Sequence, residues 1–285
     1  MWLELKETRE PLVEILYYTD PYCTWCWGSE PILRRLREVY GEQIKITYKM
    51  GGLVENIDNF YDPTNRISGI EQVAPHWQEA SQRHSMPVDI KVFEEIKKDF
   101  RSTYPANIAY KAAQFQGDEL AERFLRRIRE AAASERKHIH RPEVLLELAG
   151  EVGLDKERFA RDLKSKKAEG AFRADLYEAR SRGIYGFPAF VVKNQEGQEI
   201  MLKGYNPFEA FVRVFERLAG SPLRERKLPN IENFVKKYGQ VATKEVAEVF
   251  GLSPKEAKRK LRRLERAGSV KEIVLGNGSF WRPVS

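Results

Sequence analysis

Hydrophobic and polar positions follow two different periods in the first fifty residues. Residues 13–18 (VEILYY) are a compact apolar run before Asp20-Pro21, and residues 43–50 (QIKITYKM) alternate, so both predict strands. Between them, apolar positions recur at helical spacing and a glycine ends the series: Leu33, Leu36, Tyr40 and Gly41. We therefore expect a helix over residues 27–40, kinked at Pro31, between two strands.

A long helical region follows, from about residue 69 to residue 181. Its clearest amphipathic segments are 105–116, 118–136, 141–151 and 156–163. Strands at 189–192 and 199–203 then predict a hairpin, and a helix starting at Asn206-Pro207 ends at Gly220. The pattern predicts an α/β domain over residues 1–220, whose sheet is interrupted by a helical insertion at about 55–182.

A second, smaller pattern begins after the polar, proline-bounded residues 221–229, which predict a linker. Three short helices are expected at 230–238, 243–250 and 253–267, with Thr243 and Ser253 as N-caps. Strands at 270–275 and 279–281 flank Gly276-Asn277-Gly278 and predict a hairpin. This order is typical of a winged helix, so residues 230–285 predict a small winged-helix-like domain.

Charge differs sharply between the two regions. Residues 222–285 contain 15 Lys and Arg against 7 Asp and Glu, whereas the remainder has 34 against 35. In the third helix of the small domain, an apolar stripe turns the basic residues outward, among them Lys258, Arg259, Arg262, Arg263 and Arg266. These residues are candidates for binding nucleic acid or a protein partner, and a solvated helix face is the alternative.

The only two cysteines, Cys23 and Cys26, lie where the first strand ends and the helix begins. A helix N-terminus stabilises a thiolate, so we expect a lowered pKa for Cys23 and assign it as the nucleophile, with Cys26 resolving the mixed disulfide. Tyr22 and Trp25 are candidates for an apolar surface that binds the substrate, and Trp27 fits either that surface or the core. No cofactor is needed for this chemistry.

Pro188 follows Gly186-Phe187 and opens the third strand. We predict a cis Phe187-Pro188 bond beside the cysteines, which would let the Phe187 backbone pair with an extended substrate. Zinc binding by the cysteines with His138 and His140 is disfavoured because the pairs lie over a hundred residues apart. His76 and His84 are expected to be solvated. We expect no metal site.

Residues 1–10 carry scattered charges, and no uncharged run is long enough to span a bilayer, so we expect a cytoplasmic protein without membrane contact.

The segment DPYCTWCWG at residues 20–28, the proline five positions after Cys26, the helical insertion and the late Gly-Phe-Pro resemble the DsbA family, in particular its FrnE-like branch. The resemblance implies a thioredoxin fold with an inserted helical domain, a dithiol–disulfide site at Cys23 and Cys26, and a cis proline at Pro188. It also implies protein thiols and disulfides as substrates.

The tail resembles the YjbH/SpxH adaptors, through the run VATKEVA at residues 241–247 and GSFW at residues 278–281. Those adaptors join a DsbA-like domain to a winged-helix-like tail and deliver the regulator Spx to the ClpXP protease. The His/Cys-rich N-terminal segment of that family has no counterpart here, whereas the CxxC pair is intact. We therefore expect an intracellular thiol–disulfide oxidoreductase or isomerase, with an adaptor for regulated proteolysis or a redox-responsive DNA-binding protein as alternatives.

Overall fold

The computed structural model describes residues 10–63, 65–96, 99–219 and 223–284. Residues 1–9, whose scattered charges contributed to the expectation of a cytoplasmic protein, and residues 220–222 at the predicted domain boundary lie outside the described residues. Within the described part of the chain, no helix is long and apolar enough to cross a membrane.

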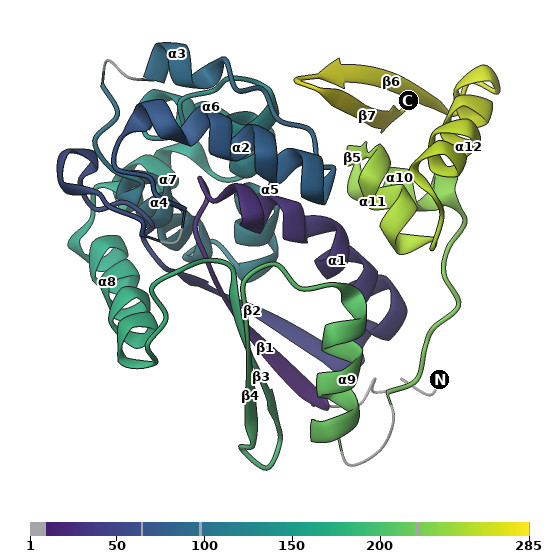
Figure 1. Cartoon of the computed structure of the whole chain (residues 1–285), viewed down its shortest axis with the longest axis horizontal. Coiled ribbons are helices and arrows are strands. Elements are labelled where there is room, and N and C mark those ends of the chain that lie inside the picture. The colour runs from purple at the N-terminus through teal and green to yellow at the C-terminus, as the bar shows by residue number, and fades with distance from the viewer. Residues whose placement is uncertain (1–9, 64, 97–98, 220–222, 285) are drawn as a thin grey trace, which may run out of the picture.

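A four-stranded sheet forms the centre of the first domain (Figure 1). Strand β1 (Val13–Thr19) pairs in parallel with β2 (Ile44–Met50) and antiparallel with β3 (Ala189–Asn194), which pairs with β4 (Glu199–Lys203). The parallel pair needs a crossover, and α1 (Thr24–Tyr40) provides it. This helix begins three residues earlier than predicted, contains Pro31 in its interior, and ends at Gly41, which has a positive φ of 56°.

The helices of the insertion follow β2 and precede β3 in the chain. They are α2 (Ile70–His84), α3 (Val92–Ile96), α4 (Tyr104–Gln114), α5 (Asp118–Ser134), α6 (Pro142–Glu151), α7 (Lys156–Leu163) and α8 (Lys166–Ser181). Their apolar faces join the sheet in one hydrophobic core, which α9 (Phe208–Leu218) completes on the other side of α1. The four predicted segments match α4, α5, α6 and α7 to within two residues at each end, whereas α2, α3 and α8 lie in the predicted helical region without a segment of their own.

The C-terminal module consists of α10 (Ile231–Tyr238), β5 (Val241–Ala242), α11 (Thr243–Val249), α12 (Pro254–Arg266), β6 (Val270–Leu275) and β7 (Gly278–Pro283). Its strands form a sheet in the order β5-β7-β6, of which β5 was not predicted. Thr243 is not the N-cap of α11: that cap is Ala242, whose N–H is held by the Glu245 carboxylate at 2.6 Å. The Thr243 hydroxyl instead accepts a hydrogen bond from Trp281 Nε1 at 2.9 Å.

The module is joined to the first domain by buried charges. Glu245 of α11 lies 3.0 Å from Arg34 of α1 and 3.1 Å from Arg126 of α5, and its side chain is fully buried. The Arg126 guanidinium also stacks over the Trp27 ring, 4.3 Å from its centroid. We call this group of charges the seam. Because each charge would be costly to bury alone, the seam couples the two regions.

A second contact fastens the hairpin tip of the module. Asn277 donates its backbone N–H to Val88 O at 3.0 Å and accepts from Val88 N at 2.8 Å, and its amide also donates to the Ser81 hydroxyl at 3.1 Å. A Cβ on Gly276 would lie only 2.4 Å from Val88 O, so the turn fits this place only with glycine there. The described part of the predicted linker is also held, since Arg226 N–H bonds to Val39 O at 2.7 Å.

Candidate functional site

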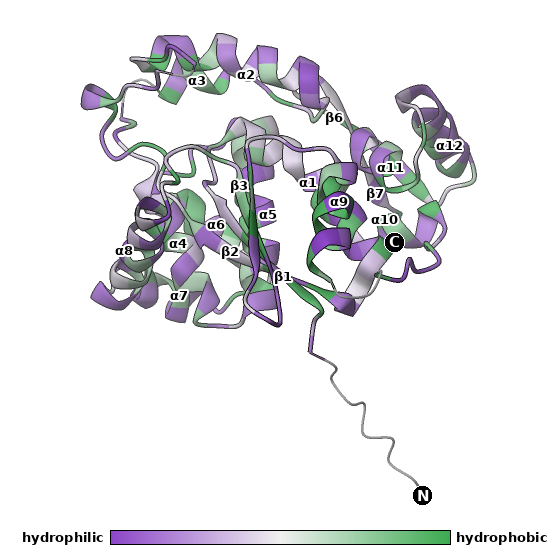
Figure 2. Ribbon diagram, turned by 60° about the horizontal axis from the view of Figure 1, so that its bottom comes forward, coloured by the Kyte–Doolittle hydropathy of each residue, from purple (hydrophilic) through white to green (hydrophobic). Residues whose placement is uncertain are grey.

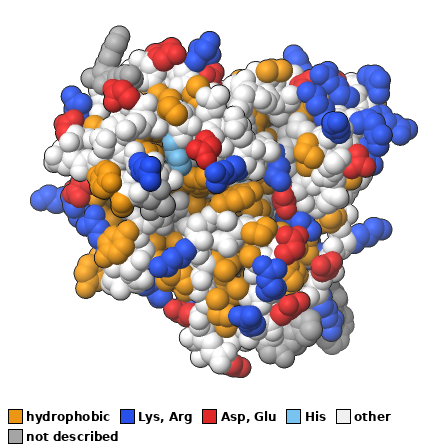
Figure 3. All heavy atoms as spheres, in the orientation of Figure 1, with side chains coloured by type: hydrophobic (Ala, Val, Ile, Leu, Met, Phe, Trp, Pro, Cys, Tyr) orange, Lys and Arg blue, Asp and Glu red, His pale blue; other side chains and the backbone are white. Residues whose placement is uncertain are grey.

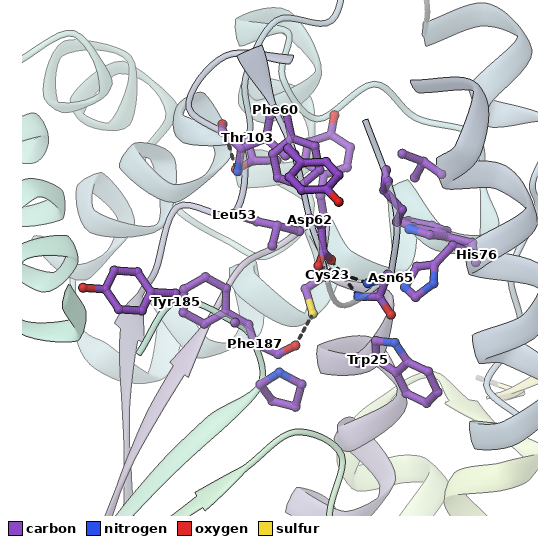
Figure 4. Close-up of a pocket in the computed structure, with 18 of the residues that line it drawn as sticks. Cys23, Trp25, Leu53, Phe60, Asp62, Asn65, His76, Thr103, Tyr185 and Phe187 are labelled. Carbon is purple, nitrogen blue, oxygen red and sulfur yellow. Dashed lines mark hydrogen bonds between the residues drawn. The ribbon is translucent and has the colours of Figure 1, made fainter. Parts of the chain in front are cut away.

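Cys23 caps the N-terminus of α1. Its sulfur accepts the Cys26 N–H at 3.2 Å and donates to the carbonyl of Phe187 at 3.3 Å (Figure 4). Both cysteines are free thiols, but Cys23 retains 5% of its surface and Cys26 none. The Phe187–Pro188 peptide bond is cis, as predicted. The fold thus brings both cysteines, Phe187 and Pro188 together, and only Cys23 is open to a partner.

The pKa values of the two thiols differ from our expectation. Burial raises the pKa of Cys23 well above its ordinary value, because the capping N–H does not offset the loss of solvent around a thiolate. Burial would also raise the pKa of Cys26, but the hydrogen bond from Cys23 and the charge of Arg129 outweigh it, so this pKa is lowered. The predicted lowering at Cys23 is therefore wrong, and the charge is favoured on the inner sulfur.

Arg129 of α5 supplies that positive charge, and sequence analysis missed it. It is 1% exposed, forms an ion pair with Glu30 of α1, and donates to the hydroxyl of Thr19 at the end of β1. The one sign in the sequence was its position four residues after Leu125, on the apolar stripe of an amphipathic helix. A charge on such a stripe needs a buried partner. Here the partners are Glu30 and Thr19, and they hold the guanidinium where its charge acts on Cys26.

Asp20 anchors the turn that precedes Cys23. Its buried carboxylate accepts four hydrogen bonds of 2.7 to 2.8 Å, from Tyr22 N, Leu53 N, Thr103 Oγ1 and Asn107 Nδ2. Burial raises its pKa in spite of these bonds. Thr103 and Asn107 belong to the helical insertion, so the carboxylate ties the turn that precedes Cys23 to that insertion.

A groove with a volume of about 810 Å³ opens over Cys23. Tyr22, Trp25, Phe187 and Pro188 all line it, so the structure gathers the residues that we expected to bind substrate (Figure 4). Tyr61 and Tyr185, which the sequence did not single out, lie along it with 66% and 76% of their surface exposed. Hydrophobic side chains gather in the middle of the face seen in Figure 3. Trp27, in contrast, is 1% exposed and donates from Nε1 to Pro87 O at 2.9 Å, so it belongs to the core.

The histidines are placed differently from expectation. His84 is fully buried and lies 3.3 Å from the Thr24 hydroxyl, so the prediction of a solvated residue is wrong. His76 is half-buried beside Trp25. His140 contacts the Tyr22 hydroxyl at 3.0 Å rather than either cysteine. Among the described residues, no three His, Cys, Asp or Glu side chains gather in a way that could hold a metal ion.

The basic candidates lie on α12 of the C-terminal module and none of them lines the groove. Lys258 and Arg262 pair with Glu272 of β6, whereas Arg259, Arg263 and Arg266 are exposed and form no ion pair with any residue that the structure describes. The thiol site and the basic helix are therefore separate surfaces.

Comparison with known proteins places these features in context. Residues 16–213 match the thioredoxin family model. The chain is 31% identical over 97% of its length to the ClpXP adapter protein SpxH of Halalkalibacterium halodurans, covering 90% of that protein. It is 32% identical over 98% of its length to SpxH of Shouchella clausii, covering 91%.

Among solved structures, the cytosolic disulfide reductase DsbM of Pseudomonas aeruginosa superimposes with a TM-score of 0.57 at 26% identity. The match covers 72% of this chain and 98% of DsbM. It leaves out more than a quarter of this chain, whereas the similarity to SpxH extends over nearly the full length. The two resemblances seen in the sequence, to the DsbA family and to the YjbH/SpxH adaptors, are confirmed. The full-length similarity to SpxH supports the adaptor alternative better than the enzyme that we expected first.

Proposed function

The chain belongs to the thioredoxin family and, over nearly its whole length, to the family of the ClpXP adapter proteins SpxH, and from this membership we propose that it is an adaptor that presents a protein to ClpXP. The observation that carries the proposal is that the similarity extends through the C-terminal module, which an enzyme of the thioredoxin fold does not require. The protein partner named by the family resemblance is Spx.

The arrangement of the two regions supports this role. We propose a DsbA-like domain over residues 1–220, with the insertion at about 55–182, and a winged-helix-like domain over 230–285. The seam and the Asn277 contact hold them in one orientation, and so two distant surfaces are presented at a fixed separation. An adaptor must contact a client and a protease together, and a rigid spacing favours this because it lowers the ordering cost of the second contact.

The experiment is degradation of purified Spx by purified ClpXP from the same organism, with and without the full-length chain. We expect the chain to accelerate loss of Spx at substoichiometric concentration. Equal rates with and without it, when the protein is shown to be folded by circular dichroism, would remove the adaptor proposal.

We also propose a thiol–disulfide exchange activity, which the geometry at Cys23 favours. The Cys26 thiolate accepts the proton of Cys23 as the Cys23 sulfur attacks a client disulfide, forming a mixed disulfide and releasing one client thiolate. Cys26 then passes that proton to the departing client sulfur as it attacks the Cys23 sulfur, which frees the second client thiol and leaves a Cys23–Cys26 disulfide. The cis Pro188 segment offers its Phe187 backbone beside the reacting sulfur.

Reduction of insulin with a thiol reductant as electron source tests this second activity. Cys23→Ser is expected to lose it entirely, while the matched change Ser29→Ala on the same helix retains it. If Cys23→Ser reduced insulin as fast as the unmodified chain, the exchange proposal would fail and the adaptor proposal would be untouched.

A further inference from the structure

The outer face of α12 is a concentrated positive surface that no part of the described chain covers. Its exposed basic residues are Lys255, Lys258, Arg259, Lys260, Arg262, Arg263 and Arg266. The helix buries only Ala257 and Leu261, so most of its circumference faces solvent (Figure 2). Figure 3 shows Lys and Arg side chains crowded over this helix, at the upper right of the view.

The helix holds this surface in place firmly. Ser253 caps its N-terminus, accepting from Glu256 N at 3.3 Å, while the Glu256 carboxylate accepts the Ser253 N–H at 3.0 Å. On one flank, Glu272 of β6 pairs with Lys258 and Arg262. Counted at 100° per residue, Lys255, Arg259 and Arg266 lie opposite the buried stripe, and Arg263 lies beside them. Within the described part of the chain, none of these four has an acidic partner near enough for an ion pair.

The way in which the C-terminal module packs on the first domain restricts what the outer face of α12 binds. In a winged helix that grips DNA, the recognition helix enters the major groove while the hairpin remains free to reach the backbone. Here the hairpin tip is fastened to Val88 through Asn277 and packs Gly278 against Pro87. The face of α11 that packs on α1 is likewise occupied, through Glu245 and Glu248. The outer face of α12, in contrast, is left free by the described part of the chain.

We infer that this face of α12 binds an acidic protein surface, and that it is the second docking surface of the adaptor, chemically distinct from the apolar groove at Cys23. The inference rests on the proposed function. The groove favours an extended apolar segment, whereas α12 attracts carboxylates over a distance of about a Debye length, so the two surfaces discriminate between two partners. A partner recognised by α12 carries clustered Asp and Glu.

Removing the positive charges of three arginines on the outer face of α12 tests the inference. The variant Arg259→Gln/Arg263→Gln/Arg266→Gln keeps helix propensity and leaves the pairs with Glu272 intact. The control Arg161→Gln/Lys164→Gln/Lys166→Gln removes the same charge from exposed positions on the insertion. Binding of each full-length protein to purified Spx, to purified ClpX and to a duplex DNA of arbitrary sequence is measured by interferometry at 50 and 200 mM salt.

We expect the α12 variant to bind one of the two proteins about tenfold more weakly at 50 mM salt, with a smaller dependence on salt, and the control variant to be unchanged. Unaltered binding of both proteins by the α12 variant overturns the inference, while acceleration of Spx degradation by the unmodified chain would leave the adaptor proposal standing. Binding of DNA by the unmodified chain, lost in the α12 variant and stronger than binding of either protein, also overturns it. A chain that binds neither protein contradicts both proposals.

Discussion

The first domain and the C-terminal module differ in what holds them in place. Within the first domain, the sheet and the insertion share an apolar core built from aromatic and branched side chains. Between the domain and the module, the joint contains Arg34, Arg126, Glu245 and the hydrogen bonds of Asn277. Apolar packing tolerates exchange of one side chain for another of similar volume, whereas a buried charge needs its particular partner. The fold of the first domain therefore rests on hydrophobic burial, whereas the module, of which Ala242 and Phe280 also join that core, depends in addition on charge pairing.

Removing the acid at the centre of the seam is expected to have the largest effect. Glu245→Ala removes the buried ion-pair partner of Arg34 and leaves Arg126 with Glu130 alone, and should lower the free energy of unfolding by about 3–5 kcal/mol. Urea denaturation measures this change. The matched variant Glu248→Ala removes a carboxylate that is more exposed and pairs with Lys244 and Arg35, and should cost about 1 kcal/mol or less. If the two variants lowered the free energy of unfolding equally, the seam would not be what holds the module to the first domain.

Acid should weaken the first domain through His84. Burial lowers the pKa of His84 to about 4, from an ordinary value of 6.5. The unfolded chain therefore binds a proton that the folded chain resists, and stability falls as pH decreases from 6.5 towards 4, by up to about 3 kcal/mol. Urea midpoints across this range should show a much shallower slope in His84→Gln. Burial also lowers the pKa of the half-buried His76, so His76→Gln should flatten the slope as well, but to a smaller extent than His84→Gln.

The hairpin tip should contribute less than the seam. Asn277→Ala removes the side-chain acceptor of the buried Val88 N–H and the bond to Ser81, which should cost about 2 kcal/mol. Asn206→Ala, which removes exposed hydrogen bonds to Lys203 O and Gly204 O, serves as the control and should be nearly neutral. If Asn277→Ala is also neutral in thermal unfolding, the tip does not help to orient the module.

The smallest effect concerns the reactivity of the outer thiol. Because the pKa of Cys23 is raised, iodoacetamide should alkylate it at neutral pH about tenfold or more slowly than a cysteine in the unfolded chain, and faster as the pH rises. Cys26, with no exposed surface, should remain unlabelled. Mass spectrometry of peptides after timed labelling distinguishes the two. Rapid labelling of Cys23 at neutral pH would contradict the assignment of the charge to the inner sulfur.

Much of the backbone was predictable because its signals are local. The alternation at residues 43–50, the glycines that end helices, and the turn at Gly276-Asn277-Gly278 each specify an element within a few residues. The CxxC pair and Phe187-Pro188 came together because the thioredoxin fold places them side by side, which the resemblance implied. Strand β5 was missed because two residues are too few for a periodic pattern.

The electrostatics of the site were not predictable from neighbouring residues. Arg129 lies on a helix about a hundred positions further along the chain, and its charge helps to lower the pKa of Cys26, whereas the sequence predicted the lowered pKa at Cys23. Glu245 and Arg34 were hidden in the same way, since each lies on a helix whose polar residues looked solvated. Such pairs depend on which helices pack together, and a single sequence does not carry that information locally.

The most direct measurement is the rate at which ClpXP degrades Spx in the presence of the Cys23→Ser/Cys26→Ser chain. We assign client delivery to two docking surfaces on a rigid body and treat thiol exchange as a separate activity. We therefore expect the double variant to accelerate degradation as well as the unmodified chain does. Loss of that acceleration in a variant that remains folded would contradict the account, because delivery would then depend on the sulfur chemistry.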